Sequence, residues 1–425
     1  MCGIVAGANS EWVAETIVQM SYRGPDEQRL YHRGGFTIGH ARLSIVAVKA
    51  AEAIQPAMTR KGRIVAFNGE IYNYQSLMPG ARSELETLAA MLDEGLDPRQ
   101  FVDGDYAIIY YDPSNQVVTL YRDRFGAIPL YYQTRPTLVS SERRHLFSPM
   151  EVPQHGKVVI DLRSEMIQHV DRIPHYGVTC DVGLDSINSF LRLFLYSVAR
   201  RAQHSDVGFS LALSGGLDSS LIAFALRELK LQPKAAVCVA LEKESTDLHY
   251  ARMVAKECGL NLKEVIITPD QIAKDRAQIL YHLDSPHMPT QLKWRGSIRN
   301  WYAALHSPSR VMLSGEGADE LLGGYPSHFK DKEHPFQVAE KCLSTIRSMP
   351  SINLDRTNKL GLAHSIEYRM PYLDSTLSYL LLAGGRMRGK QLIRSTLRAI
   401  GAPAELCNRE KYSDDEAKLE ATLLS

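Results

Sequence analysis

Short apolar runs dominate the first third of the chain. Residues 64–67, 107–111, 117–121 and 157–161 are rich in β-branched and aromatic side chains and are bounded by turn-forming segments. Such runs predict short strands, and several of them in succession predict an antiparallel sheet system. The pattern is interrupted within residues 160–185, where Pro174 and Gly177 occur, so we expect a domain boundary there.

The remainder of the chain alternates two periodicities. Strand-like apolar runs at residues 207–213, 235–241, 262–268 and 310–313 are separated by helical patterns, which include residues 219–229 and 247–258. This alternation predicts an α/β domain with a doubly wound parallel sheet that binds ligands at the carboxyl ends of its strands. We therefore expect two domains, at residues 2–165 and 180–425.

Composition narrows the function classes. A chain of 425 residues exceeds what one core usually supports. Its 49 basic and 48 acidic residues give a net charge of +1, which does not indicate a nucleic-acid partner. The sequence has neither a run long enough to span a bilayer nor a secretory signal, so we expect a cytoplasmic protein without a membrane partner. Six cysteines without CxxC spacing favour a reducing compartment.

The residue with the most chemical meaning is Cys2, directly after Met1. Removal of Met1 would leave a thiol and a free α-amino group on one residue. An α-amino group has a reference pKa of about 7.7–8.0, so near neutral pH it can accept the thiol proton and generate a nucleophile. An isolated cysteine at this position would more simply begin a buried strand.

Cys2 is not isolated, because five further motifs follow it in order. They are Arg23-Gly24-Pro25-Asp26, Gly39-His40-Ala41-Arg42, Phe67-Asn68-Gly69-Glu70, Asp103-Gly104-Asp105 and Asp123-Arg124-Phe125-Gly126. With Cys2 they resemble the class II glutamine amidotransferases over roughly the first 150 residues. The resemblance implies an α+β fold of the N-terminal nucleophile type, an αββα sandwich, and hydrolysis of glutamine.

The resemblance also implies residue roles. The Asn68 amide and the Gly69 backbone N–H would form the oxyanion hole, in which each donor is typically worth about 2.7–4 kcal/mol. Arg42 would bind the glutamine carboxylate, and Glu70 and Glu84 would face its amine. The family usually has Asp at the position of Glu84, so we expect altered glutamine affinity rather than loss of activity. By itself, Asn68-Gly69 would predict a hairpin turn.

A second chemical centre begins at Ser214-Gly215-Gly216-Leu217-Asp218-Ser219, between a strand pattern and a helix pattern. Such a turn presents backbone N–H groups and a helix N-terminus to an anion. It lacks the Gly-Lys-[Ser/Thr] ending of a Walker loop. It resembles instead the pyrophosphate loop of ATP pyrophosphatases, which cleave ATP between the α- and β-phosphates.

Three later segments make the resemblance specific. They are Ser314-Gly315-Glu316-Gly317-Ala318-Asp319-Glu320, Ser365-Ile366-Glu367-Tyr368-Arg369-Met370-Pro371, and Gly389-Lys390-Gln391 with Arg409-Glu410-Lys411-Tyr412-Ser413-Asp414. They are similar to the signatures of the glutamine-hydrolysing asparagine synthetase family. Its chemistry implies ATP as co-substrate and Mg²⁺ as cofactor, with attack of a carboxylate on the α-phosphorus, an acyl-adenylate, and ammonia as the final nucleophile.

The residues expected in this second site follow from the resemblance. Asp218 and Asp319 would bind Mg²⁺, Lys390 would stabilise charge on the phosphates, and Glu316 would accept a proton during ammonia attack. Asp247 matches an active-site acid, although a helix N-cap explains it equally well. The residues that would contact ATP are Ser214, Gly215, Gly216, Asp218, Ser219, Val239, Ser314 and Gly315.

The acceptor is the open question. The family resemblance favours aspartate, but residues 283–295, where the family forms its aspartate pocket, depart from the usual pattern. Another small-molecule, peptide or metabolite carboxylate is the main alternative, and a catalytically silent binding protein is a third. The chain is also shorter than typical bacterial members, which would enlarge the pocket or loosen its closure. A homodimer and an internal ammonia channel are further expectations from the family.

Overall fold

The structure is a computed structural model that describes residues 1–174, 187–284, 291–325, 335–384 and 390–409. The chain forms two compact units. The first contains Met1–Pro174 with Asp284–Pro286 and Leu362–Ser365, and the second contains His175–Leu283, His287–Gly361 and Ile366–Ser425.

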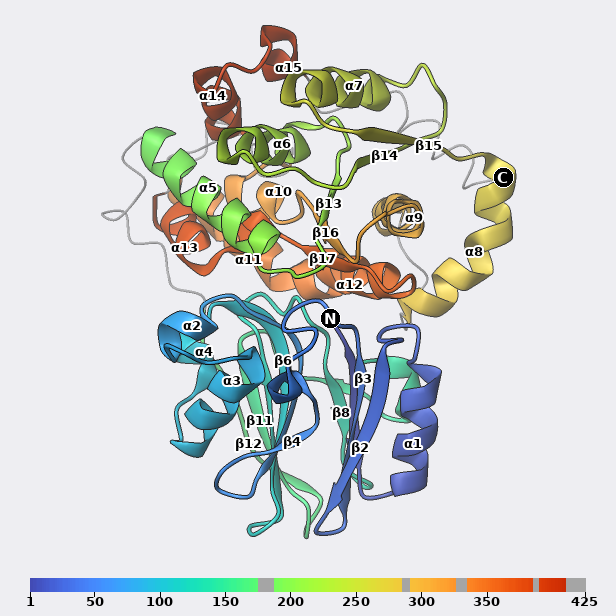
Figure 1. The fold of residues 1–425 in the computed structure, drawn as a ribbon, viewed down its shortest axis with the longest axis vertical. Helices are drawn as coiled ribbons and strands as arrows, with labels where there is room; N and C mark the ends of the chain where they lie inside the picture. The colour runs from blue at the N-terminus through green and yellow to red at the C-terminus, as the bar shows by residue number, and fades with distance from the viewer. Residues whose placement is uncertain (175–186, 285–290, 326–334, 385–389, 410–425) are drawn as a thin grey trace. The chain divides into compact units, whose positions relative to one another are not determined.

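Two antiparallel six-stranded sheets make up most of the first unit (Figure 1). One has the order β10-β8-β9-β1-β3-β2 and the other β12-β11-β7-β6-β5-β4. The first comprises β1 (Gly3–Gly7), β2 (Glu27–Arg33), β3 (Phe36–Arg42), β8 (Tyr131–Gln133), β9 (Leu138–Ser140) and β10 (Met150–Glu151). The second comprises β4 (Ala57–Met58), β5 (Ile64–Ile71), β6 (Gly104–Asp112), β7 (Val117–Arg122), β11 (Gly156–Asp161) and β12 (Met166–Arg172).

One longer helix covers each sheet on the side away from the other, which gives a helix–sheet–sheet–helix layering. Helix α1 (Ser10–Gln19) packs on β1 and β3, and α3 (Glu84–Asp93) packs on β5. The side chains of Asn9 and Ser83 cap their N-termini by accepting backbone N–H bonds. The short helices are α2 (Tyr74–Leu77), α4 (Pro98–Phe101), η1 (Ala51–Ala53) and η2 (Arg143–His145).

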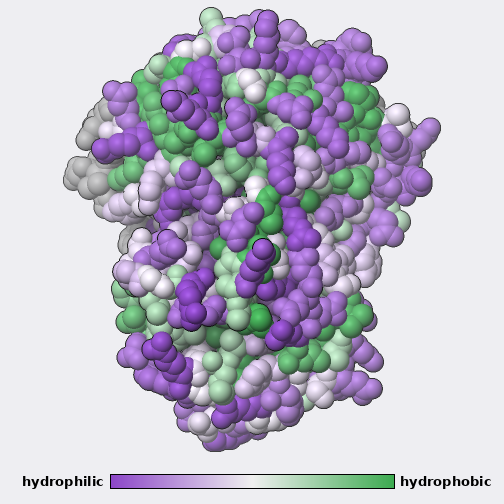
Figure 2. Space-filling model, viewed as in Figure 1, coloured by the Kyte–Doolittle hydropathy of each residue, from purple (hydrophilic) through white to green (hydrophobic). Residues whose placement is uncertain are grey.

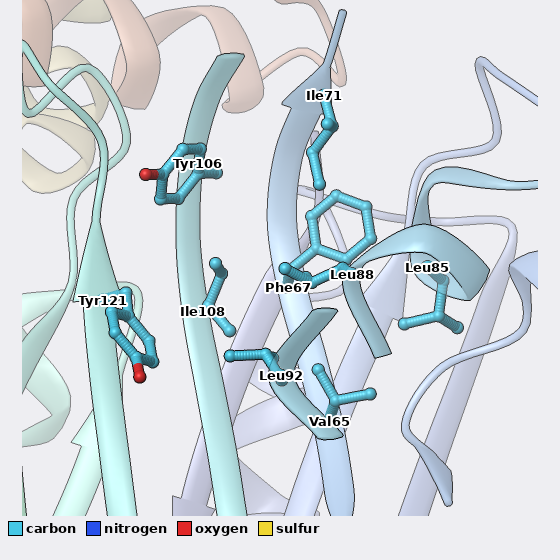
Figure 3. Close-up of a cluster of buried hydrophobic side chains, with 9 residues drawn as sticks. All are labelled: Val65, Phe67, Ile71, Leu85, Leu88, Leu92, Tyr106, Ile108 and Tyr121. Carbon is cyan, nitrogen blue, oxygen red and sulfur yellow. The ribbon is translucent and has the colours of Figure 1, made fainter. Parts of the chain in front are cut away.

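A buried cluster fixes α3 on its sheet (Figure 3). Its side chains come from β5, β6, β7 and α3, and they are Val65, Phe67, Ile71, Leu85, Leu88, Leu92, Tyr106, Ile108 and Tyr121. Leu88 is fully buried, and truncation of such a leucine to alanine typically costs about 2–5 kcal/mol. The cluster therefore holds the first turn of α3, which carries Glu84, in a defined place.

The second unit contains a parallel five-stranded sheet with the order β15-β14-β13-β16-β17. Its strands are β13 (Ser210–Ala212), β14 (Ala236–Ala240), β15 (Leu262–Ile266), β16 (Val311–Leu313) and β17 (Glu367–Arg369). The described helices are α5 (Ile187–Gln203), α6 (Leu217–Leu229), α7 (Thr246–Cys258), α8 (Pro269–Leu283), α9 (Gln291–Leu305), α10 (Ala318–Leu322), α11 (Pro335–Met349), η4 (Pro350–Leu354), α12 (Asp355–Leu362), η5 (Pro371–Leu373), α13 (Ser375–Gly384), α14 (Gln391–Ala399) and α15 (Ala404–Asn408).

The strand order reverses between β13 and β16. From β13 the chain proceeds outward to β14 and β15, and it then returns to the other side of β13 to form β16 and β17. Right-handed crossovers in opposite directions place helices on opposite faces of a sheet, and Figure 1 shows α6 and α7 on one face and α9 on the other. Ligands of such sheets bind at the carboxyl ends of the strands where the order reverses.

The predicted elements are confirmed in outline. The apolar runs of the first third lie in β5, β6, β7 and β11, which are antiparallel. The later runs contain β13 to β16, and the two helical patterns correspond to α6 and α7. In the part of the chain that the structure describes, no helix has the length and apolarity needed to cross a membrane. Hydrophilic and apolar residues intermix on the face shown in Figure 2.

Candidate functional site

The first unit contains a pocket around the start of the chain. Met1 and Cys2 line it together with residues of β3, β5 and the start of α3. The Cys2 backbone N–H donates a 2.6 Å hydrogen bond to Asn68 Oδ1, and Arg23 Nε donates a 3.2 Å bond to the Cys2 carbonyl. Cys2 is 9% exposed, so the thiol is held at the edge of a largely enclosed space.

Asn68 and Gly69 lie next to each other on β5. Asn68 is fully buried, and among the described residues its Nδ2 has no hydrogen-bond partner. Gly69 has φ +130°, and an added Cβ would lie 1.9 Å from the Asp105 carbonyl oxygen on β6. Only glycine fits this strand crossing. The strand therefore presents a buried amide donor beside the Cys2 backbone, and the hairpin alternative is wrong because both residues lie within the β5–β6 ladder.

The predicted glutamine-binding residues line the same pocket. Arg42, Glu70 and Glu84 all contribute to its wall. Arg42 donates to the Ala47 carbonyl at 3.2 Å. Glu84 accepts a 2.5 Å hydrogen bond from the Ile71 backbone N–H through Oε1, which ties its carboxylate to the end of β5.

His40 also lines the pocket, although no role was predicted for it. It pairs with Ile4 between β3 and β1, and it lines the pocket two residues before Arg42. Burial, helped by the positive charge of Arg42, lowers the pKa of His40 to about 3, so the imidazole is neutral. The alternation of side chains along a strand was the signal that could have found it, since positions 40 and 42 share a face.

The second unit has its pocket at the reversal of strand order. The walls are formed by Ala212, Leu213, Ser214, Asp218, Ser219, Val237, Val239, Gly296, Arg299, Asn300, Ala303, Ser314, Gly315, Glu316, Gly317, Asp319, Glu320 and Tyr325. The predicted ATP contacts Ser214, Asp218, Ser219, Val239, Ser314 and Gly315 are among them. Gly215 and Gly216 complete the turn between β13 and α6 without lining the pocket.

The turn before α6 is internally hydrogen-bonded. Ser214 N–H donates to Ser219 Oγ at 3.2 Å, and the two hydroxyls are 3.1 Å apart. Gly215 has φ +69°, and a Cβ there would lie 2.3 Å from the Asp247 carbonyl oxygen. The turn thus rests against the start of α7. It also directs the N-terminus of the 13-residue helix α6 into the pocket.

Two carboxylates and one ammonium meet beside this turn. Lys390 Nζ lies 2.5 Å from Asp218 Oδ2 and 2.7 Å from Asp319 Oδ1. Burial disfavours the charged amine, but Asp218 and Asp319 outweigh it and raise the pKa of Lys390. An added Cβ at Gly324 would lie 1.9 Å from Asp319 Oδ1, so glycine leaves room for this pair. Two carboxylates that converge on one cation suit Mg²⁺, which prefers oxygen ligands.

Glu316 and Glu320 differ in their surroundings. Glu316 Oε1 is ion-paired with Arg356 Nη2 at 2.7 Å. Glu320, which the sequence analysis did not single out, is 3% exposed and accepts 2.6 Å hydrogen bonds from Tyr325 and Asn353. Burial raises the pKa of Glu320 to about 7. The pocket wall therefore contains one carboxylate that is paired with arginine and one that is buried and hydrogen-bonded.

Asp247 is not a helix N-cap. Ser245 caps α7, because its side chain accepts the Leu248 backbone N–H at 3.1 Å. The Asp247 carboxylate instead forms ion pairs with Arg299, at 2.9 Å, and with Arg409. Residues 285–290 of the predicted acceptor segment and residues 410–414 of the last motif lie outside the described residues.

Comparison with known proteins agrees with this geometry. The family model of the glutamine amidotransferase domain matches residues 1–175, and that of asparagine synthase matches residues 189–341. The chain belongs to the glutamine-hydrolysing asparagine synthetase family. As a member of this family it is a carbon–nitrogen ligase with a glutamine amidotransferase domain.

Two relatives in this family illustrate how far the sequences have diverged. Asparagine synthetase (glutamine-hydrolysing) of Cricetulus griseus is 28% identical, and that of Homo sapiens 27%; each alignment covers 93% of this chain and 80% of the relative. Among solved structures, the glutamine phosphoribosylpyrophosphate amidotransferase of B. subtilis is 11% identical over 98% of this chain and 94% of its own, at a TM-score of 0.35. That likeness is too distant to bear on function.

Proposed function

We propose that the chain amidates a carboxylate, with aspartate as the acceptor and asparagine as the product, using ATP and ammonia from glutamine. The proposal assigns glutamine hydrolysis to residues 2–165, which would form an N-terminal nucleophile domain, and ATP-dependent synthesis to residues 180–425. The observation that carries it is the convergence of Lys390, Asp218 and Asp319 beside the turn between β13 and α6. This set suits a nucleotide whose phosphates need both a fixed cation and a divalent metal.

Glutamine hydrolysis would begin at the Cys2 thiol once Met1 is removed. The new α-amino group accepts the thiol proton, and the thiolate attacks the side-chain carboxamide. The Asn68 Nδ2 and the Gly69 N–H stabilise the oxyanion. The amine leaves as ammonia after protonation, and water releases glutamate from the thioester. Arg42 binds the substrate carboxylate, and Glu70 and Glu84 bind its amine.

Adenylation would take place in the second pocket. Ser214, Gly215, Gly216 and Ser219 bind the β- and γ-phosphates, while Val239, Ser314 and Gly315 border the adenosine. The acceptor carboxylate attacks the α-phosphorus, the bond to the β-phosphate breaks, and pyrophosphate leaves. Lys390 stabilises the charge that develops on the phosphates. Asp218 and Asp319 would hold Mg²⁺, which supplies Lewis-acid stabilisation of the phosphate oxygens.

Amide formation would complete the reaction. Ammonia attacks the acyl carbon of the adenylate, AMP leaves with the C–O bond electrons, and one proton is lost from nitrogen. Glu316 is the proposed acceptor of that proton. Its ion pair with Arg356 must then loosen in the reacting complex, because a carboxylate oxygen bound at 2.7 Å by a guanidinium is a poor proton acceptor.

The test measures AMP and pyrophosphate formed from Mg-ATP and glutamine, with and without aspartate, together with mass detection of asparagine. Cys2→Ala should abolish synthesis from glutamine and retain synthesis from ammonia. Cys258→Ala is the matched control, since burial raises the pKa of the Cys258 thiol to about 12 and leaves it inert; it should retain both activities. Glutamate release without aspartate-dependent AMP would refute aspartate as acceptor and redirect the search to other carboxylates.

A further inference from the structure

The second pocket has an uneven charge distribution. Four of its described lining residues are carboxylic acids, namely Asp218, Glu316, Asp319 and Glu320, whereas Arg299 is the one basic lining residue among them. Under the proposed function this wall must accept the polyanion ATP. The position and pairing of Arg299 therefore decide which part of the pocket attracts negative charge.

Arg299 belongs to α9 and is held by a shared carboxylate. Its Nη2 lies 2.9 Å from Asp247 Oδ2, and its side chain is 31% exposed. The other oxygen of Asp247 is bound by Arg409, whose guanidinium also donates to the Gly215 carbonyl and lies 4.4 Å from the centre of the Tyr250 ring. Two guanidinium groups thus share one carboxylate. The trio has a net charge of +1, and Arg299 is its member in the pocket wall.

The trio adjoins the turn that begins α6. A Cβ at Gly215 would lie 2.3 Å from the Asp247 carbonyl oxygen and 2.8 Å from the Ala251 nitrogen, so the turn and the first residues of α7 are in van der Waals contact. Arg409 bonds to both the turn and Asp247. Arg299 is therefore linked to the turn before α6 through Asp247 and Arg409. It lies one helical turn after Gly296, where an added Cβ would lie 2.3 Å from Arg356 Nη1.

We propose that Arg299 binds the β- and γ-phosphates of ATP, and the pyrophosphate formed from them, with Asp247 as its positioning residue. This inference rests on the proposed use of ATP. A guanidinium suits the role because it offers several donors in a fixed fork that matches phosphate oxygens, and its pairing with Asp247 uses only one side of the fork. Lys390 is already engaged by Asp218 and Asp319, so Arg299 is the cation that can receive phosphate without losing a partner first.

The experiment is calorimetric titration of the full-length protein with ATP, pyrophosphate and AMP, each in excess Mg²⁺. Arg299→Met should weaken ATP and pyrophosphate about 10- to 100-fold, as expected for loss of charged hydrogen bonds, and leave AMP affinity within about twofold. Arg299→Lys should fall between, because it keeps the charge and loses the fork. Asp247→Asn should weaken ATP more than AMP.

Arg252→Met is the matched control, because Arg252 also pairs with a carboxylate, Glu264 at 2.7 Å, and is not part of the pocket; it should change none of the affinities. Equal loss of ATP and AMP binding in Arg299→Met would indicate local damage and overturn the inference. Unchanged ATP binding with a raised KM for the acceptor would overturn it too, and would assign Arg299 to the acceptor carboxylate. Absence of ATP binding by the unaltered protein would instead refute the proposed function.

Discussion

Replacement of Asn68 by alanine separates the two proposed activities in one protein. Asn68 is fully buried on β5, its Oδ1 accepts the Cys2 backbone N–H at 2.6 Å, and its Nδ2 is the proposed oxyanion donor. Loss of one such donor typically costs about 2.7–4 kcal/mol of transition-state stabilisation. We therefore expect Asn68→Ala to lower kcat for glutamine hydrolysis about 10²- to 10³-fold.

The same substitution has a stability cost that can be measured separately. The Cys2 N–H loses its acceptor, and an unsatisfied buried donor costs about 1–3 kcal/mol. Urea unfolding should report that loss. Ammonia-dependent formation of AMP, measured in the same preparation at a temperature where the protein is folded, should change less than about twofold, because the second pocket contains none of the altered atoms.

Asn73→Ala is the control for this experiment. Asn73 also uses both ends of its amide, since Nδ2 donates to the Phe101 carbonyl and Oδ1 accepts from Asp103 N–H, each at 2.9 Å, and it is not part of the Cys2 pocket. It should destabilise the fold and retain glutaminase activity. If Asn73→Ala lowers glutamine hydrolysis as much as Asn68→Ala does, or if Asn68→Ala loses both activities equally, the oxyanion assignment is wrong.

Three further predictions follow from single contacts. Gly69→Ala should destabilise the protein by more than about 3 kcal/mol, since its Cβ would lie 1.9 Å from a backbone oxygen at a positive φ; a small shift in unfolding midpoint would contradict the β5–β6 geometry. Without nucleotide, Lys390→Met should bind Mn²⁺ at least about fivefold more tightly than the unaltered protein does, because repulsion between two unit charges about 4 Å apart is worth about 1 kcal/mol even in water. Weaker Mn²⁺ binding by the variant in calorimetry would show that the ammonium organises the site. The pKa of His40 is about 6.5 in the unfolded chain and about 3 in the folded protein, so the unfolded state binds the extra proton and stability falls as the pH drops from about 6.5 to 3. His40→Gln should reduce that loss of stability by on the order of 3 kcal/mol at pH 4. Equal pH slopes of the unfolding free energy in the two proteins would refute the prediction.

Elements whose composition is locally typical were predictable from the sequence. The β-branched residues of β5, β7 and β14 predict strands, and the alternation of strands and helices after residue 207 predicts a parallel sheet. Strand β3, with the sequence FTIGHAR, was not predicted, and β1, with the sequence GIVAG, was considered only as the alternative setting of Cys2, because glycine and alanine do not favour strands. Their pairing through Gly3–Gly7 and Thr37–Ala41 buries both strands almost completely, and such long-range contacts decide the structure there.

The site residues also divide into those that local sequence could predict and those that depend on long-range contacts. Cys2, Asn68 and Asp218 lie in motifs whose local order indicates their chemistry, and each lies at or beside a pocket. Arg299 has no local signature, and Glu320 lies in a signature segment without any local sign of its burial or partners. Their character arises from partners far along the chain, as in the pairing of Glu320 with Asn353, which no periodicity or spacing reveals. Long-range contacts also decide the cap of α7. Ser245 caps the helix, and Asp247 instead forms ion pairs with Arg299 and Arg409, which lie far along the chain.

The charge arrangement of the second pocket explains how nucleotide binding can be favourable in a wall rich in carboxylates. Without nucleotide, Lys390 is ion-paired with both Asp218 and Asp319, and Arg356 is ion-paired with Glu316. Under the proposed function, Asp218 and Asp319 would hold Mg²⁺, and Lys390 would exchange its pairing with them for pairing with the phosphates. Binding then exchanges one set of ion pairs for another and leaves no buried charge without a partner, which avoids the several kcal/mol that an unpaired buried ion costs. This exchange couples the two aspartates to Lys390, so Asp319→Asn combined with Lys390→Met should lose less Mg-ATP binding free energy than the sum of the two single losses. Additive losses in calorimetry would contradict the exchange.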